Sequence, residues 1–232
     1  MKIIKPSVEI LTEVNGEEIL KHIEKIGRVC YKSEDKITDE SAKEFVANII
    51  KRGHEAVIEH FNISVKFICD RGVSHEIVRH RIASYAQEST RYCNYSKDKF
   101  DNQITFIQPC WFMYDYTIYS PSKLEDRLLK KDLVFDDVET NWLTIMSQSE
   151  KSYKQLIEYG WSAQEARSVL PNSLKTEIVV TMNLREWRHF FKLRTAKVAH
   201  PQMREVAIML LEQLKEKLPV IFDDITIQKG NN

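Results

Sequence analysis

Apolar and polar residues recur with two different periods along this chain, and these periods predict a mixture of strands and helices. Stretches rich in β-branched residues or with alternating polarity predict strands at 6–13, 61–69, 103–109 and 176–183. Stretches with apolar residues every three or four positions predict helices at 16–28, about 38–50, 71–80, 137–159, 184–194 and 201–218. The second of these carries Ala42, Phe45, Ile49 and Ile50, and the longest carries Val138, Trp142, Ile145, Tyr153 and Leu156.

Capping residues and chain breakers set the boundaries of these elements. Thr38 or Asp39 is the expected cap of the second helix, and Gly160 is expected to end the long one. Ser162 and Glu165 form an S-x-x-E pattern typical of a capping box, which predicts a further helix that stops at Pro171.

The order of these elements has no regular strand–helix–strand rhythm, which favours an α+β (irregular α/β) fold. We expect a single domain over residues 1–232, with a mixed sheet and flanking helices. The chain contains neither a G-x-G-x-x-G sequence nor a P-loop, so a bound nucleotide would depend on side chains and helix ends.

Charge and composition exclude several classes of protein. The 34 basic and 34 acidic residues balance, which disfavours a general binder of nucleic acid. The chain has no 18-residue apolar run and no signal-peptide pattern at its start, so we expect neither a membrane span nor export. Its cysteines lie far apart without a C-x-x-C pair, which favours free thiols in the cytoplasm and no structural zinc: Cys30, Cys69, Cys93 and Cys110.

A basic triplet, Arg79, His80 and Arg81, stands out because adjacent like charges repel unless an anion draws them together. Ser89 and Arg91 follow. If residues 88–91 are extended, these two side chains point to the same side and can form a phosphate cradle. The segment 185–204 adds six basic residues against one acidic residue, so the neutral total hides a basic pole suited to a small phosphorylated ligand.

At this point the sequence resembles the flavin-dependent thymidylate synthases, whose signature is RHR, seven residues and a serine. Further motifs follow in the family's order: "HEAVIEH" at 54–60, "ARSVLP" at 166–171, and "MNLREWRHFFKLRTAKVAHPQMRE" at 182–205. The resemblance extends over about residues 1–222.

The resemblance implies a reaction and its partners. The substrate dUMP would be methylated at C5 to give dTMP, with methylenetetrahydrofolate as carbon donor. FAD, reduced by NADPH, would carry the hydride. The resemblance also implies a homotetramer whose active sites are shared between chains.

It further implies roles for residues at matching positions. The implied cofactor-binding residues are His54, Glu59, Arg79, His80, Arg81, Asn183, Arg185 and His189. The implied substrate-binding residues are Glu76, Arg79, Gln87, Ser89, Arg91, Arg167 and Arg194. Arg194 and Ser89 are the catalytic candidates, Arg194 gripping the uracil ring and Ser89 acting as a phosphate ligand and not as a nucleophile, since no histidine base is near it in the pattern. No metal ligands are implied.

The chain departs from the family pattern at a few positions. Many members have Asn and Glu where this chain has Ala86 and Gln87, Asn in place of His189, and Gln in place of Glu76. Gln87 can offer its backbone N–H to a phosphate but lacks a carboxylate. His200 and Arg204 fit a subunit interface or a helix start equally well.

Two other functions compete with this one. A thymidylate synthase with a cysteine nucleophile would use Cys110, but the apolar residues that follow Cys110 would raise its pKa. A non-catalytic nucleotide- or RNA-binding protein would use the same arginines, yet it gives no reason for the order of the motifs.

Overall fold

The computed structural model describes residues 1–130 and 137–227, which divide into two compact units. Unit 1 comprises Met1–Ser7, Ile68–Ile77 and Gln87–Ile178. Unit 2 comprises Val8–Phe67, Val78–Ala86 and the chain from Val179 onward. The mixed α+β class expected from the sequence is confirmed.

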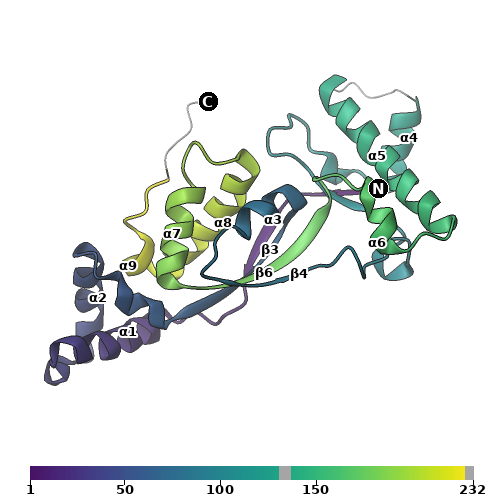
Figure 1. The fold of residues 1–232 in the computed structure, drawn as a ribbon. Helices are drawn as coiled ribbons and strands as arrows, with labels where there is room; N and C mark the ends of the chain where they lie inside the picture. Colours follow the sequence, from purple (N-terminus) through teal and green to yellow (C-terminus); the bar gives the residue numbers. More distant parts are fainter. Residues whose placement is uncertain (131–136, 228–232) are drawn as a thin grey trace. The chain divides into compact units, whose positions relative to one another are not determined.

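In the part of the chain that the structure describes, the strands form two sheets where one was expected, and Figure 1 labels three strands of the larger one. The first pairs β1 (Lys2–Ile4) with β5 (Thr105–Ile107) in parallel, with Lys2 opposite Thr105. The second has the order β2-β3-β6-β4, built from β2 (Ser7–Ile10), β3 (Asn62–Asp70), β6 (Lys175–Asn183) and β4 (Ser84–Gln87). In β3 and β6 buried residues alternate with half-buried ones, as their sequence pattern predicts. β1 was not expected, and β2 is shorter than the predicted strand.

Unit 2 contains helices α1 (Gly16–Tyr31), α2 (Ser41–Lys51), α7 (Leu184–Arg194), α8 (Pro201–Lys217) and α9 (Pro219–Phe222). Figure 1 shows α7 beside α8, and these helices close over a core rich in aromatic rings. Trp187, Phe190 and Phe191 of α7 are fully buried, and Trp187 donates a hydrogen bond from its indole nitrogen to the carbonyl of Ile63 in β3. These contacts pack α7 against β3.

Unit 1 contains α3 (Arg71–Ile77), α4 (Pro121–Lys130), α5 (Asp137–Glu158) and α6 (Ala163–Ala166). The long helix was predicted correctly, but its buried face was wrong in part, since Val138 and Ile145 are exposed. The buried face carries Leu143, Met146 and Tyr153 together with two carboxylates. Glu139 accepts hydrogen bonds from the Tyr116 hydroxyl and a backbone N–H, and Glu150 pairs with the N-terminal ammonium at 2.6 Å. Buried carboxylates need such partners, and the apolar pattern of the sequence does not report them.

Several predicted boundaries are wrong, and local hydrogen bonding explains them. α3 ends at Ile77, so the basic triplet lies in the loop after the helix rather than on it. α2 begins at Ser41 with Glu40 as its N-cap residue, and not at the expected cap, Thr38 or Asp39. The Ser41 hydroxyl accepts from the N–H of Thr38 and donates to its carbonyl, which closes a turn before the helix.

Other boundaries agree with the sequence. Gly160 has a φ of +91°, a left-handed conformation that glycine adopts without strain, and it follows the end of α5. The Ser162–Glu165 capping box is present, although α6 is short and continues as a 3₁₀ turn toward Pro171. Among the described residues, no helix combines the length and apolar character needed to cross a bilayer.

Candidate functional site

Two clefts in unit 2 share one wall, which consists of Ile82, Glu186 and His189. The first, which we call the cap cleft, has a volume of about 500 Å³ and is also lined by Glu55, Glu59, Asn183, Arg185 and Lys192. The second, which we call the triplet cleft, has a volume of about 560 Å³ and is also lined by Arg79, His80, Arg81, Leu193, Arg194, Val198 and Ala199.

These clefts gather most of the cofactor residues that the resemblance implies. Glu59, Asn183, Arg185 and His189 line the cap cleft, and Arg79, His80, Arg81 and His189 line the triplet cleft. They come from three segments far apart in the sequence. His54 lines a separate hollow between α1 and α2, where its Nδ1 lies 3.0 Å from the hydroxyl of Tyr31.

Helix α7 forms one side of both clefts. A capping residue fixes where the helix begins, and the helical repeat then sets which side chains share a face. Asn183 caps it, accepting a 2.8 Å hydrogen bond from the backbone N–H of Glu186. From Glu186, steps of four residues lead to Phe190 and Arg194, so these three side chains lie on one face of the helix.

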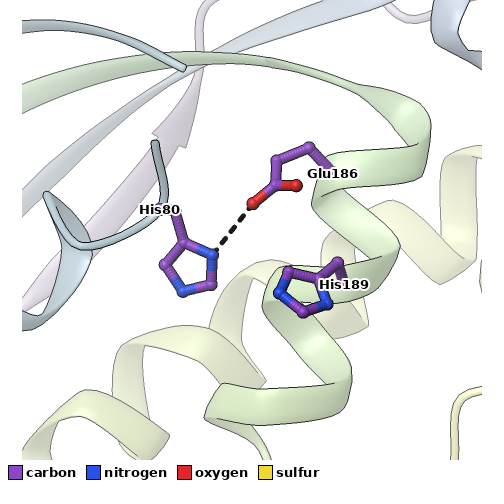
Figure 2. Close-up of side chains that lie close together, drawn as sticks. All are labelled: His80, Glu186 and His189. Atoms are coloured by element: carbon purple, nitrogen blue, oxygen red, sulfur yellow. Dashed lines mark hydrogen bonds and ion pairs between the residues drawn. The ribbon is translucent and has the colours of Figure 1, made fainter. Parts of the chain in front are cut away.

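His80 contacts this face of α7, and its side chain is only 3% exposed. Its ring packs against Phe190, with ring centroids 4.9 Å apart. Its Nδ1 lies 3.1 Å from Oε1 of Glu186, and its Nε2 lies 3.0 Å from Nε of Arg194 (Figure 2 shows the contact with Glu186). The hydroxyl of Tyr85 donates to the carbonyl of His80, and burial raises the pKa of Tyr85 to about 12, so that donor keeps its proton.

These contacts determine where the ring proton of His80 lies. The Nε of arginine is always a donor, so Nε2 of His80 must accept and the proton must be on Nδ1, facing the Glu186 carboxylate. Burial lowers the pKa of His80 below its ordinary value, which favours the neutral ring that this arrangement requires.

His80, Glu186 and His189 each offer one possible metal-ligating atom, and these atoms lie within 4.8 Å of one another (Figure 2). Both ring nitrogens of His80, however, already have hydrogen-bond partners in the protein. A metal ion would have to displace one of these bonds and lie close to a guanidinium. The contacts therefore favour a hydrogen-bonded cluster over a metal centre.

Charge pairing makes the basic pole smaller than the sequence indicated. Arg188 is 2% exposed and forms ion pairs with Glu55 at 3.0 Å and Asp224 at 2.6 Å, so it holds the unit together rather than facing a ligand. Arg185 pairs with Glu59 at 2.5 Å on the exposed rim of the cap cleft. Two implied flavin residues thus contact each other directly.

Most of the implied substrate residues belong to unit 1, where the Arg167 guanidinium donates a 3.1 Å hydrogen bond to the hydroxyl of Thr90. This bond brings Arg167 against the loop that carries Ser89 and Arg91. The loop is a turn and is not extended, since the N–H groups of Tyr92 and Cys93 donate to the carbonyl of Ser89. The Ser89 hydroxyl instead accepts from the backbone N–H of Arg91 at 3.3 Å.

Two implied substrate residues are less directly presented to a ligand. The amide nitrogen of Gln87 contacts the hydroxyls of Ser74 and Thr176, so this side chain is anchored inside unit 1. Glu76 is half-buried on α3. Arg79 and Arg194 belong to unit 2.

Sequence reasoning missed Glu186, although it lines both clefts and contacts His80. The sequence around Glu186 carried only a partial indication of this position. Glu186 is the third residue after the Asn183 cap, which explains a glutamate there without any role in a site. The one sequence signal for a further role was its spacing of eight residues from Arg194, which predicts that both side chains lie on the same face of the helix.

The family model and the individual relatives that match this chain agree in the family that they indicate. The model of a family described as "Thymidylate synthase complementing protein" matches residues 11–220. A protein of Pyrococcus horikoshii named flavin-dependent thymidylate synthase is 37% identical over 192 residues, covering 81% of this chain and 70% of that protein. One of Geobacter sulfurreducens with the same name is 34% identical over 205 residues, covering 85% and 78%.

The chain spans only part of some relatives. It covers 66% of the length of a flavin-dependent thymidylate synthase of Pyrococcus abyssi, to which it is 34% identical over 185 residues, or 79% of this chain. The fold also matches a crystal structure of PolB from Streptomyces cacaoi, a UMP/dUMP methylase bound with 5-Br dUMP. The TM-score is 0.69 and the identity 21%, over 96% of each chain.

Proposed function

Because this chain belongs to the thymidylate synthase complementing protein family, which confirms the family expected from its motifs, we propose that it is an FAD-dependent thymidylate synthase. It would convert dUMP to dTMP with methylenetetrahydrofolate as the carbon donor and NADPH as the reductant. The observation that carries this proposal is the gathering of seven of the eight implied flavin residues around two clefts with a common wall.

The residues of these clefts fit FAD. A dinucleotide of this kind carries a pyrophosphate and a flat polar ring, so its site needs cations and hydrogen-bonding groups in a space of several hundred Å³. Arg79 and Arg81 supply exposed guanidinium groups at the triplet cleft, and Asn183, Arg185 and His189 supply polar groups at the cap cleft. When bound and reduced, FAD would supply the hydride.

Arg194 would act on the substrate. Negative charge develops on a uracil carbonyl when hydride reaches the ring, and a fixed guanidinium beside it stabilises the transition state more than the ground state. The bond from Nε of Arg194 to His80 holds the plane of the guanidinium, which is the preorganisation that such stabilisation requires.

The phosphate of dUMP would bind in unit 1. Ser89, Arg91 and Arg167 are the residues we assign to it, supported by the contact between Arg167 and Thr90 in the turn that carries the other two. Ser89 would donate its hydroxyl to a phosphate oxygen. Glu76 and Gln87 complete the proposed substrate set, Gln87 through its backbone.

The proposal also includes that the protein is a homotetramer and that it is located in the cytoplasm. Around the triplet cleft, Val198 is 96% exposed, Ile82 is 67% exposed and Leu193 is 49% exposed. Apolar side chains that collect at the rim of a cleft are typical of surfaces that a partner covers. This supports active sites that are completed by another copy of the chain.

Anaerobic turnover tests the proposal directly. The purified protein should be yellow, NADPH should bleach its flavin absorbance, and dUMP with methylenetetrahydrofolate should then yield dTMP by chromatography. Omission of dUMP or of the folate serves as the control. A colourless protein that binds single-stranded RNA and forms no dTMP would instead support the non-catalytic alternative.

A further inference from the structure

We infer that Glu186 is a positioning residue which, through His80, sets the orientation of the Arg194 guanidinium. The inference rests on the proposed function, in which Arg194 contacts the uracil ring. Its structural part, a Glu186–His80–Arg194 relay of hydrogen bonds, can be tested without any measurement of turnover.

The geometry of the relay leaves one arrangement of protons. Nε of Arg194 donates to Nε2 of His80, so the ring of His80 carries its proton on Nδ1 and donates it to Oε1 of Glu186. The carboxylate thereby selects the tautomer. In the opposite tautomer, Nε2–H would face the Nε–H of Arg194, and two donors cannot share a hydrogen bond.

Burial and packing make Glu186 effective in this role. Glu186 is 8% exposed and His80 is 5% exposed, so water competes little for either hydrogen bond. The ring of His80 also packs against Phe190 and His189, with centroid distances of 4.9 Å and 5.8 Å. A ring confined in this way transmits the choice of tautomer to the group on its far nitrogen.

The chain offers a matched control for Glu186. Glu18 is likewise the third residue after a capping asparagine, since Asn15 accepts a hydrogen bond from its backbone N–H as Asn183 does for Glu186. Glu18 is exposed on α1. Substitutions at the two positions change the same charge at the same place in a helix, and only one of them removes the partner of His80.

The first test measures the tautomer by ¹⁵N NMR of histidine-labelled protein, with the His80 signals assigned by their loss in His80→Gln. We expect a protonated Nδ1 and an unprotonated Nε2, together with a coupling across the bond from Nε of Arg194. Glu186→Ala should abolish the coupling, and Glu18→Gln should retain it. A protonated Nε2 in the parent protein would overturn the relay.

The second test separates positioning from folding by kinetics. Glu186→Ala should lower kcat about 10- to 100-fold, the scale for loss of an orienting partner behind a functional group. The KM for dUMP, the flavin content and the thermal midpoint should stay close to those of Glu18→Gln. Glu186→Gln keeps an oxygen that can accept from Nδ1 and should recover part of the rate. If Glu186→Ala does not fold, the kinetic test compares Glu186→Gln with Glu18→Gln, and the first test is decided by the tautomer in the parent protein.

The outcomes distinguish this inference from the proposed function. Turnover to dTMP with a kcat for Glu186→Ala equal to that of Glu18→Gln would overturn the positioning role while the proposed function stands. The expected tautomer and coupling in a protein that forms no dTMP would support the relay and overturn the proposed function. A fall in kcat that is matched by loss of flavin or of folded protein would assign Glu186 to structure and overturn the inference.

Discussion

Helices α1 and α7 begin with the same pattern, an asparagine followed three residues later by a glutamate: Asn15 and Glu18 in α1, Asn183 and Glu186 in α7. In both helices the asparagine side chain accepts from the N–H of the glutamate. Glu18 is exposed, whereas Glu186 is buried against His80, which lies 106 positions away in the sequence.

Local sequence thus explains where each helix begins, but it does not show which distant residues the side chains at that position contact. The cap is a local interaction and follows from the pattern in both places. The contact of Glu186 arises only because the loop after α3 carries His80 onto the face of α7. A glutamate that its position in a helix cap already explains can therefore also contact a candidate site residue such as His80.

Among these predictions we expect the largest effect on turnover from a substitution of Arg194, the last residue of α7. Arg194→Lys keeps the charge but loses the planar guanidinium and its Nε donor to His80. Turnover at saturating dUMP should fall on the order of 10²-fold, the scale for one oriented donor in the transition state. Steady-state dTMP formation checks this, with flavin reduction by NADPH as the internal control.

Glu18→Gln at the start of α1 is the reference for this measurement. It should turn over at the rate of the parent protein. Turnover of Arg194→Lys within twofold of the parent would remove Arg194 from the mechanism, and with it the functional contrast between the two helices.

The sequence predicted much of the fold, because periodicity reports which faces are buried. The strands β3 and β6 and the helices α1, α7 and α8 follow from it, as does the end of α5 at Gly160. It missed the two carboxylates, Glu139 and Glu150, on the buried face of α5, and it missed the serine that closes a turn before α2.

Motifs in the sequence supply candidate site residues, but they do not show the contacts that these residues make. Motifs identified Arg79, His80, Arg185 and Arg194, whose spacing resembles that of a known family. They could not show that Arg188 in the same motif is buried in ion pairs, because its partner Asp224 lies 36 positions away. Nor could they pair Glu186 with His80, since such long-range pairing depends on the packing of α7 against the sheet.

A second prediction compares the two caps. Asn15→Ala and Asn183→Ala each remove the acceptor for a helix N–H and should each lower the free energy of unfolding by about 1 kcal/mol. The loss should be larger for Asn183, whose hydrogen bond is 2.8 Å long against 3.4 Å for Asn15. Urea unfolding measures both.

Only one of these two variants should affect the cofactor. Asn183 lines the cap cleft, so Asn183→Ala should also lower the flavin content of the purified protein, whereas Asn15→Ala should not. Equal flavin content in the two variants would show that the cap of α7 has no part in binding.

A third and smaller effect concerns the charge at the start of α1. Glu18→Gln removes a negative charge from the positive end of the helix, which should lower the free energy of unfolding by about 0.5 kcal/mol or less at an exposed position. The loss should shrink further in high salt, because screening weakens an exposed charge. A loss that does not depend on salt would mean that Glu18 has a specific partner and is not a clean control.

The smallest expected effect is on how stability depends on pH, since opposing influences act on His80. Burial lowers its pKa from the ordinary 6.5, Glu186 on α7 raises it, and Arg194 and His189 on the same helix lower it, with a net lowering. Tyr85 of β4 donates to the His80 carbonyl, and the charged residues Arg79 and Arg81 are the neighbours of His80 in the chain.

Between the lowered pKa of folded His80 and 6.5, the unfolded chain binds a proton at this histidine that the folded chain does not. The free energy of unfolding should therefore fall as the pH falls below 6.5. Urea unfolding at a series of pH values should show a shallower fall for His80→Gln than for the parent, and an unchanged one for Glu18→Gln. The same slope in His80→Gln and the parent would mean that His80 is not held neutral, which would remove the basis for its proton on Nδ1. The difference between the starts of α1 and α7 would then be one of burial alone.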